Sequence, residues 1–152
     1  IDKAPSNFFW IGFISLLFPN SKIIHIKRNI KDNCLSIYKN LFGGNRTEWT
    51  YDIDNIQNYV KIYREMMDFW KSKFDKKIYE INYEDLVKNQ EIEIRNLLNF
   101  CNLQFEQKCL EHHKSKNPIK TVSINQSRKP IYKDSIESNL KYKNFNNLFK
   151  DI

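Results

Sequence analysis

Glycine is scarce in this sequence, and the motifs that depend on it are missing. The 152 residues include only three glycines, Gly12, Gly43 and Gly44, and none of them follows a stretch that is predicted to be a strand. A phosphate-binding loop of the form GxxxxGK[ST] requires glycine at that place, and the sequence contains no such motif. It also contains no HExxH motif and no serine, histidine and aspartate in the order of a hydrolase triad. We therefore expect that a complete nucleotide-dependent enzyme does not fit in these residues.

Cysteine and histidine are equally few, and their spacing argues against a metal site. The three cysteines are Cys34, Cys101 and Cys109, and no CxxC pair exists beside the three histidines. We expect Cys34 and Cys101 to pack as small apolar side chains, because both fall on apolar helix faces. An odd number of cysteines without a signal peptide is compatible with a reducing compartment.

Long hydrophobic runs are absent too. The longest apolar stretch, residues 8–18, has 11 residues and includes Gly12 and Ser15, whereas a membrane-spanning helix needs about 20. It is therefore predicted to be a buried helix and not a membrane segment. Because no linker or repeat divides the chain, residues 1–152 are interpreted as one domain. The first residue is Ile1 and not methionine, so we expect the N-terminus to be a cut through a larger protein.

Positive charge is in excess, with 25 lysines and arginines against 18 acidic residues, which gives a net charge of +7. Such an excess favours an anionic partner, for example a nucleotide, a nucleic acid, an acidic peptide or a membrane surface. A lysine-rich solvated surface explains the charge equally well. The lysines are scattered along the chain, and this argues against a dedicated nucleic-acid stripe.

Apolar periodicity predicts an α/β fold. Residues 22–27 and 78–81 are predicted to be strands, and residues 52–75 a long amphipathic helix between them. Strand, helix and strand form a βαβ crossover, so the two strands are expected to be parallel with a right-handed connection. Further helices are predicted after Asn29, after Glu84, around residues 94–101 and in "FEQKCLEHH". The tail is predicted to be a polar loop to Pro130 and then a helix from about Ser135.

Arg28 follows the first strand directly, and Asn29 is a plausible N-cap for the helix that comes next, with Asp32 completing a capping box. Because ligands of parallel sheets bind beyond the carboxyl ends of the strands, Arg28 and Tyr83 should lie at such a site. An arginine beside the free N–H groups of a helix start is suited to a phosphate, and Ser36 could add one hydroxyl donor. The alternative is that Arg28 pairs with Asp32 and that Ser36 is incidental.

Two other segments offer donors for an anion. Lys3 lies near the chain start, where a strand is expected to end at Pro5, although a solvated terminal lysine is the alternative. The loop "SINQSRKPIY", residues 123–132, combines hydroxyl, amide and cationic groups and contains no acidic residue. Such a loop suits a phosphorylated ligand, but an ordinary exposed loop is the alternative.

Three stretches in order resemble one family: residues 2–42 ("DKAPSNFFW" to "SIYKNLF"), then "YEDLV", then "TVSINQSRKPIY". Together they resemble the C-terminal part of the sulfotransferase domain, especially the bacterial tetratricopeptide-linked branch that is similar to tyrosylprotein sulfotransferases. The resemblance covers essentially the whole chain. It implies a P-loop-kinase-like three-layer α/β fold with a parallel sheet, of which this chain would be the C-terminal portion.

The resemblance also implies an activity and a set of residues. The family moves a sulfuryl group from 3′-phosphoadenosine 5′-phosphosulfate (PAPS) to a hydroxyl or amine without a metal. By resemblance, Lys3 stabilises the transferring group and its bridging oxygen, and Arg28 and Ser36 hold the 3′-phosphate. Tyr83 is implied to lie in the cofactor pocket, and Ser123 to begin a catalytic loop over the nucleotide. The rest of that loop is implied to bind the cofactor through Gln126, Arg128, Lys129, Pro130, Ile131 and Tyr132.

Some parts of the family pattern are not found here. The 5′-phosphosulfate loop and the glutamate base of the tyrosylprotein branch would precede this chain, so the chain alone is expected to be inactive. An arginine expected after Ser36 is replaced by Asn40, beside Lys39. Near the end, Asn139 and Leu140 stand where relatives carry a basic residue and a tryptophan, with Lys141 as a substitute.

The acceptor and the location stay open. A peptide tyrosine, a carbohydrate and a small alcohol are all compatible acceptors, and the location would be cytoplasmic in a bacterium and the Golgi lumen in a eukaryote. No nucleic-acid partner is expected. The competing interpretation is a non-enzymatic basic module that binds nucleic acid or an acidic protein.

Overall fold

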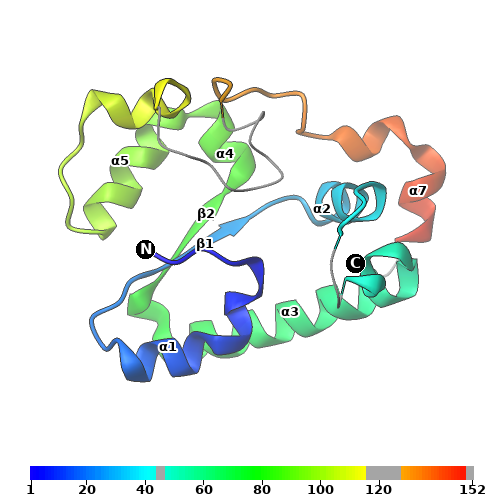
Figure 1. Cartoon of the computed structure of the whole chain (residues 1–152), viewed down its shortest axis with the longest axis horizontal. Helices are drawn as coiled ribbons and strands as arrows, with labels where there is room; N and C mark the ends of the chain where they lie inside the picture. Colours follow the sequence, from blue (N-terminus) through cyan, green and yellow to red (C-terminus); the bar gives the residue numbers. More distant parts are fainter. Residues whose placement is uncertain (44–46, 116–127, 150–152) are drawn as a thin grey trace.

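Two parallel strands lie at the centre of the computed structural model, which describes residues 1–43, 47–115 and 128–149. Strand β1 (Ile23–Lys27) pairs with β2 (Ile78–Asn82), and the register places Ile23 opposite Ile78 and Lys27 opposite Asn82. Both strands therefore end at the same edge of the sheet. The predicted parallel βαβ arrangement is confirmed. The long helix α3 (Ile53–Phe74), at the bottom of Figure 1, lies between β1 and β2 in the sequence.

Helices contact the sheet from both sides. The face with Ile23 and His25 meets α3 and the 3₁₀ helix η1 (Pro5–Trp10). On the other face, Tyr79 stacks on Phe100 of α5 (Gln90–Phe100), with ring centroids 5.1 Å apart. This arrangement is a mixed α/β fold with a two-stranded parallel sheet in the described residues, consistent with a P-loop-like fold. The remaining elements are α1 (Ile11–Leu17), α2 (Ile30–Lys39), η2 (Glu48–Tyr51), η3 (Asp75–Lys77), α4 (Tyr83–Lys88), α5 (Gln90–Phe100), η4 (Gln107–Leu110), η5 (His112–Lys114), η6 (Ser138–Lys141) and α7 (Lys143–Leu148).

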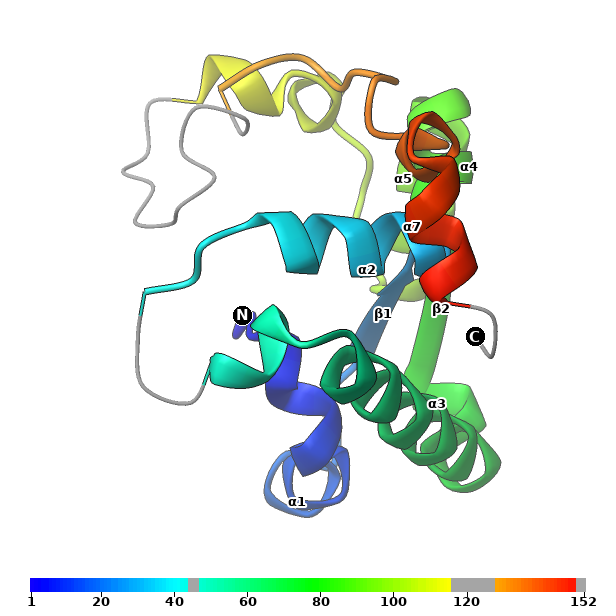
Figure 2. The ribbon, with the colours of Figure 1, turned by 90° about the vertical axis from the view of Figure 1, so that its right-hand side faces the viewer.

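The main apolar cluster joins α2, α3 and the C-terminal helix. Cys34 and Leu35 of α2 pack with Ile56 of α3 and with Phe145 and Phe149 near the end of the chain. Figure 2, which turns the molecule by 90°, shows α7 beside α2 and α3, although α7 follows both helices at a long distance in the sequence. The burial of Cys34 confirms its predicted apolar role, and Cys101 is partly buried. This packing places the C-terminal segment next to the start of α2.

Three predictions about the ends of the chain are wrong. Residues 1–4 belong to no strand, because Pro5 begins a 3₁₀ helix directly after the extended Ala4. Residues 8–18 are helical as expected but only partly buried: Phe8 and Ile11 pack against Met67, whereas Leu16 is 80% exposed. The terminal helix does not begin at Ser135, because Glu137 has a left-handed backbone (φ 56°) that interrupts any helix there. The segment "FEQKCLEHH" forms 3₁₀ turns.

Within the described ranges, no helix has both the length and the apolar content that crossing a bilayer requires.

Candidate functional site: an arginine at the sheet edge

The turn between β1 and α2 places Arg28 at the carboxyl edge of the sheet. Lys27 ends the strand, and the side chain of Asn29 caps the helix by accepting hydrogen bonds from the backbone N–H groups of Lys31 (3.1 Å) and Asp32 (3.2 Å). The predicted N-cap is therefore confirmed. Only one residue remains between strand and cap, so Arg28 has little freedom and its side chain lies at the point where parallel α/β sheets bind ligands.

The guanidinium of Arg28 is held from two sides. Its Nη2 donates a hydrogen bond to the carbonyl oxygen of Ser135 at 2.6 Å, and its central carbon lies 5.2 Å from the ring centroid of Tyr83. Its Nε is buried and has no hydrogen-bond partner among the described residues. A buried donor without a partner is costly, and an incoming acceptor would satisfy it. Tyr83 therefore lies beside Arg28, as predicted.

Asp32 does not pair with Arg28, and it does not complete the predicted capping box. Its side chain is fully buried and accepts four hydrogen bonds: from the backbone N–H of Glu137 (2.8 Å), the hydroxyl of Ser138 (3.0 Å), and the backbone N–H and side-chain amide of Asn139 (both 2.7 Å). Burial alone would raise the pKa of Asp32, but the hydrogen bonds from Asn139, Ser138 and Glu137 outweigh it and lower that pKa. The carboxylate is thus kept ionised inside the protein.

The N–H group that a capping box would satisfy has another partner. Glu84, in the first turn of α4, accepts the backbone N–H of Asn29 through its Oε1 at 2.8 Å. The two helices that follow the two strands are thereby linked at their N-terminal ends. Sequence reasoning missed this contact because the residues are 55 positions apart and belong to different periodic segments.

An open pocket of about 460 Å³ lies at this edge. It brings together the ends of both strands, the starts of α2 and α4, and the segment before η6; its lining residues are Lys27, Arg28, Asn29, Asp32, Asn82, Glu84, Lys88, Ile136 and Glu137. Of the predicted site residues that the structure describes, only Arg28 lines it directly. Lys88 and Asn82 were not predicted, although Asn82 is the last residue of β2, a position at the ligand-binding edge that could have identified it; Lys88 ends the helix α4 that follows.

Tyr83 lies beside Arg28, but the other predicted residues that the structure describes are not among the residues that line this pocket. Ser36 lies further along α2 and is partly buried, and Lys3 is exposed in the irregular residues 1–4; neither is among the pocket-lining residues. Residues 128–132 form a turn and an irregular stretch in which Lys129 and Pro130 are exposed and Arg128, Ile131 and Tyr132 are partly buried. Ser123 and Gln126 lie outside the described residues.

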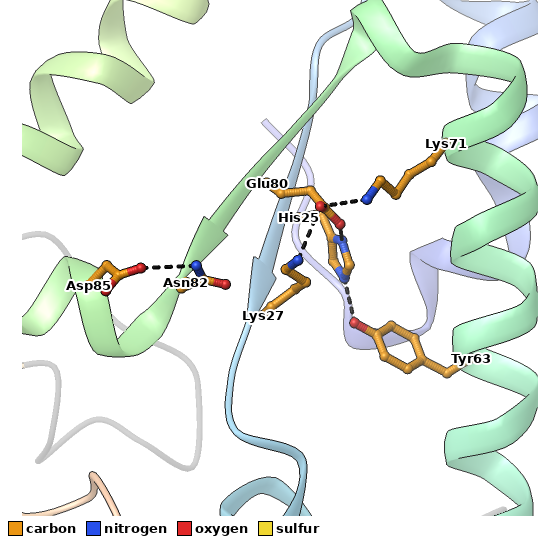
Figure 3. A network of polar contacts seen from close by, with 7 residues as sticks. All are labelled: His25, Lys27, Tyr63, Lys71, Glu80, Asn82 and Asp85. Atoms are coloured by element: carbon orange, nitrogen blue, oxygen red, sulfur yellow. Dashed lines mark hydrogen bonds and ion pairs between the residues drawn. The ribbon is translucent and has the colours of Figure 1, made fainter. Parts of the chain in front are cut away.

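A network of charged side chains fastens the same strands to α3 (Figure 3). Glu80 of β2 accepts hydrogen bonds from Lys71 (2.7 Å) and Lys27 (3.1 Å), and its other oxygen lies 3.0 Å from Nδ1 of His25. The Nε2 atom of His25 is 2.5 Å from the hydroxyl of Tyr63. One carboxylate thus joins both strands to the long helix, and it fixes the direction of Lys27 next to the pocket.

The protonation states of this network follow from its geometry. Partial burial alone would raise the pKa of Glu80, but hydrogen bonds from Lys71, Lys27 and His25 lower it to about 2. Burial lowers the pKa of His25, and the neighbouring Glu80 only partly opposes this. A neutral His25 donates its Nδ1 proton to Glu80 and accepts the Tyr63 hydroxyl proton at Nε2.

The described ranges hold no group of three or more His, Cys, Asp or Glu side chains arranged to bind a metal ion.

Comparison with known proteins identifies the family of the chain. The model of the sulfotransferase family matches residues 1–107. An uncharacterized protein of Aquifex aeolicus (strain VF5) is 40% identical over 147 residues, which are 95% of this chain but 19% of that protein. A Caenorhabditis briggsae protein named "Putative protein-tyrosine sulfotransferase" is 28% identical over 123 residues, which are 74% of this chain and 40% of that protein. The chain therefore spans less than half the length of either relative, and it belongs to the sulfotransferase family.

Proposed function

We propose that the protein transfers a sulfuryl group from PAPS to an acceptor hydroxyl, and that this chain carries the site for the 3′-phosphate of the donor. Membership of the family implies PAPS as donor in general. The observation that carries the proposal is Arg28: a guanidinium at the carboxyl edge of a parallel sheet, held by Ser135 and Tyr83, with a buried Nε that has no partner among the described residues.

The chemistry of the pocket fits a phosphate better than a neutral ligand. Arg28 presents a fixed cation at the start of α2, where the N–H of Asn29 already donates to Glu84 and those of Lys31 and Asp32 donate to the Asn29 side chain. Two of the three acidic side chains that line the pocket are already engaged, Asp32 by residues 137–139 and Glu84 by Asn29, whereas the third, Glu137, is exposed. We propose that Ser36 adds a hydroxyl donor when the donor nucleotide is bound, and that Tyr83 stays beside Arg28 in the nucleotide pocket.

We assign the reacting end of the donor to Lys3 and to the loop that begins at Ser123. In the proposed reaction the acceptor oxygen attacks sulfur, and the bond between sulfur and the bridging oxygen breaks with its electron pair going to the phosphate. The products are the sulfated acceptor and 3′,5′-adenosine bisphosphate, and the acceptor proton passes to a base, for which we propose no residue of this chain. A lysine near the bridging oxygen would stabilise the charge that develops there.

The loop of residues 123–132 is proposed to cover the nucleotide, with Ser123, Gln126 and Arg128–Tyr132 as its contacts. For the acceptor, the name of the Caenorhabditis briggsae relative favours a protein tyrosine. Transfer of radiolabelled sulfate to a tyrosine peptide, compared with a carbohydrate and a small alcohol, would identify the acceptor class.

Binding measurements on the full-length protein test the donor site. Calorimetry should show tighter binding of 3′,5′-adenosine bisphosphate than of 5′-AMP, because only the former carries the 3′-phosphate. Arg28→Ala should weaken bisphosphate binding by about 1.5–3 kcal/mol, the range for a charged hydrogen-bond partner, and should leave 5′-AMP nearly unchanged. The matched control is Arg95→Ala, which removes an exposed arginine that pairs with Glu91 on α5.

Two results would contradict the proposal. Equal affinity for the two nucleotides would remove the evidence for a 3′-phosphate site. Affinity for any long polyanion that falls steeply with salt would instead indicate a basic module for nucleic acid or an acidic protein.

A further inference from the structure

Residues 135–139, here called the C-terminal strap, lie across the start of α2 and form one wall of the pocket. Ile136 and Glu137 of the strap line the pocket, and the strap is attached at two places. Its first residue accepts a hydrogen bond from Arg28, and its last three residues donate to Asp32. More than 100 positions separate the two partners in each case, so these contacts define a tertiary feature of the site and not a local turn.

The attachment to Asp32 is specific. All four donors converge on one fully buried carboxylate, with the Glu137 N–H on Oδ2 and the donors of Ser138 and Asn139 on Oδ1. A buried carboxylate is tolerated only when its oxygens are satisfied, so the strap has one favourable conformation here. Glu137 adopts a left-handed backbone (φ 56°), which a non-glycine residue keeps only where its surroundings hold it.

A carboxylate in a phosphate pocket needs an explanation, because it repels the ligand. Asp32 lines the pocket together with Arg28, yet the two do not form an ion pair in the described structure. The oxygens of Asp32 are directed to the strap and are fully used there. Asp32 therefore stabilises the strap, and the strap in turn contacts Arg28 through Ser135.

We propose that Asp32 is a positioning residue of the nucleotide site: it fixes the C-terminal strap so that the carbonyl of Ser135 orients the Arg28 guanidinium for the 3′-phosphate. This inference rests on the proposed function, since it assigns the ligand of Arg28. Ser135 is two residues before Glu137, so loss of the Asp32 contacts frees its carbonyl as well. The guanidinium then loses its hydrogen bond to Ser135 while it keeps the contact with the Tyr83 ring, and it must be ordered when the ligand binds, which weakens binding.

The test compares Asp32→Asn with Asp54→Asn in the full-length protein. Both substitutions exchange a carboxylate for an amide in the first turn of a helix, but Asp54 is exposed on α3, far from the strap in sequence. Two readouts are measured: hydrogen exchange of the Glu137 and Asn139 amides, which donate directly to Asp32, and the ratio of affinities for 3′,5′-adenosine bisphosphate and 5′-AMP.

For Asp32→Asn we expect amide exchange to accelerate at least tenfold and the affinity ratio to fall about tenfold, as for a weakened charge-assisted hydrogen bond. A general loss of stability would weaken both nucleotides alike and leave the ratio unchanged. Asp54→Asn should change neither readout. Accelerated exchange with an unchanged ratio, or unchanged exchange, overturns the inference.

Ser138→Ala provides a second test that does not depend on Asp32→Asn folding. It removes one of the four donors to Asp32. We expect it to accelerate amide exchange and to lower the affinity ratio, each by about two- to threefold, and no change in either readout overturns the inference. Failure of the proposed function is distinguishable, because the wild-type protein would then bind both nucleotides equally. In that case the binding role of Asp32 is overturned with it, and the exchange rates decide whether Asp32 holds the strap.

Discussion

Replacing Glu80 with glutamine should destabilise the protein by an amount that depends on pH. Glu80 accepts hydrogen bonds from Lys71 and Lys27 and lies within hydrogen-bonding distance of His25, so one charge fastens β1, β2 and α3 to one another. Glutamine has nearly the same size and can keep one of these contacts. It cannot compensate two lysines, and therefore the change isolates the contribution of the charge.

The pKa of Glu80 sets the magnitude. It falls from an ordinary 4.5 to about 2, and 4.5 − 2 is 2.5, which corresponds to a ceiling of about 3 kcal/mol of folding free energy. The Lys27 and Lys71 side chains are 41% and 40% exposed, so solvent screens part of the attraction. We therefore expect Glu80→Gln to cost about 1–2 kcal/mol at pH 7, or a fall in Tm of about 2–8 °C.

The pH dependence has a defined sign. Because the pKa is lower in the folded state than in the unfolded state, the stabilisation is complete above about pH 4.5 and is lost as the pH falls toward 2. Thermal unfolding followed by circular dichroism should show the largest gap between wild type and Glu80→Gln at pH 7, a smaller gap at pH 3 and almost none at pH 2. Glu65→Gln, on the exposed face of α3, is the control. Equal gaps at pH 7 and pH 2, or no gap at pH 7, would refute the reasoning.

Two further experiments, a glycine substitution and a cysteine-labelling reaction, probe the packing. A Cβ atom at Gly12 would lie 2.8 Å from the Trp70 ring, so Gly12→Ala should lower stability by up to about 2 kcal/mol in thermal unfolding, despite alanine's better helix propensity. Gly43→Ala, where a Cβ meets nothing within 4 Å, should be nearly neutral, and equal effects at both glycines would contradict this explanation. Burial raises the pKa of Cys34 to about 11, so in mass spectrometry Cys34 should resist iodoacetamide until the protein unfolds, whereas the partly exposed Cys101 should react in the native state. Rapid labelling of native Cys34 would show that α2 is not packed as described.

Local pattern was sufficient for most of the secondary structure. The β-branched runs at residues 22–27 and 78–81 and the apolar spacing of residues 52–75 agree with β1, β2 and α3 to within a residue or two. The stretch from Phe8 to Phe18 shows the limit of such reasoning. Its composition predicted helix and burial together, but only the helix is local; burial depends on which other elements reach it, and Phe13 and Leu16 remain exposed.

The same distinction applies to the site. Arg28 and Asn29 could be placed from sequence because a strand end and a helix cap are local features, and Tyr83 followed from the parallel pairing of the strands. The partners of Asp32 and of the Asn29 N–H could not, because they lie 105 and 55 positions away. Sequence spacing suggested the nearest plausible partner for Asp32, which was Asn29 or Arg28, and both suggestions were wrong.

The reason why Arg28 and Asp32 act separately lies in the geometry of the turn. Arg28 precedes the helix cap, so its side chain is directed by the strand and reaches Ser135 and Tyr83 at the sheet edge. Asp32 lies within the first turn of α2, and its carboxylate is buried against the strap instead. Had the two paired, the charge of the arginine would have been neutralised and its Nε would have had an internal acceptor. Because four uncharged donors satisfy Asp32, the protein keeps a carboxylate near Arg28 without using the positive charge that the proposed phosphate site requires.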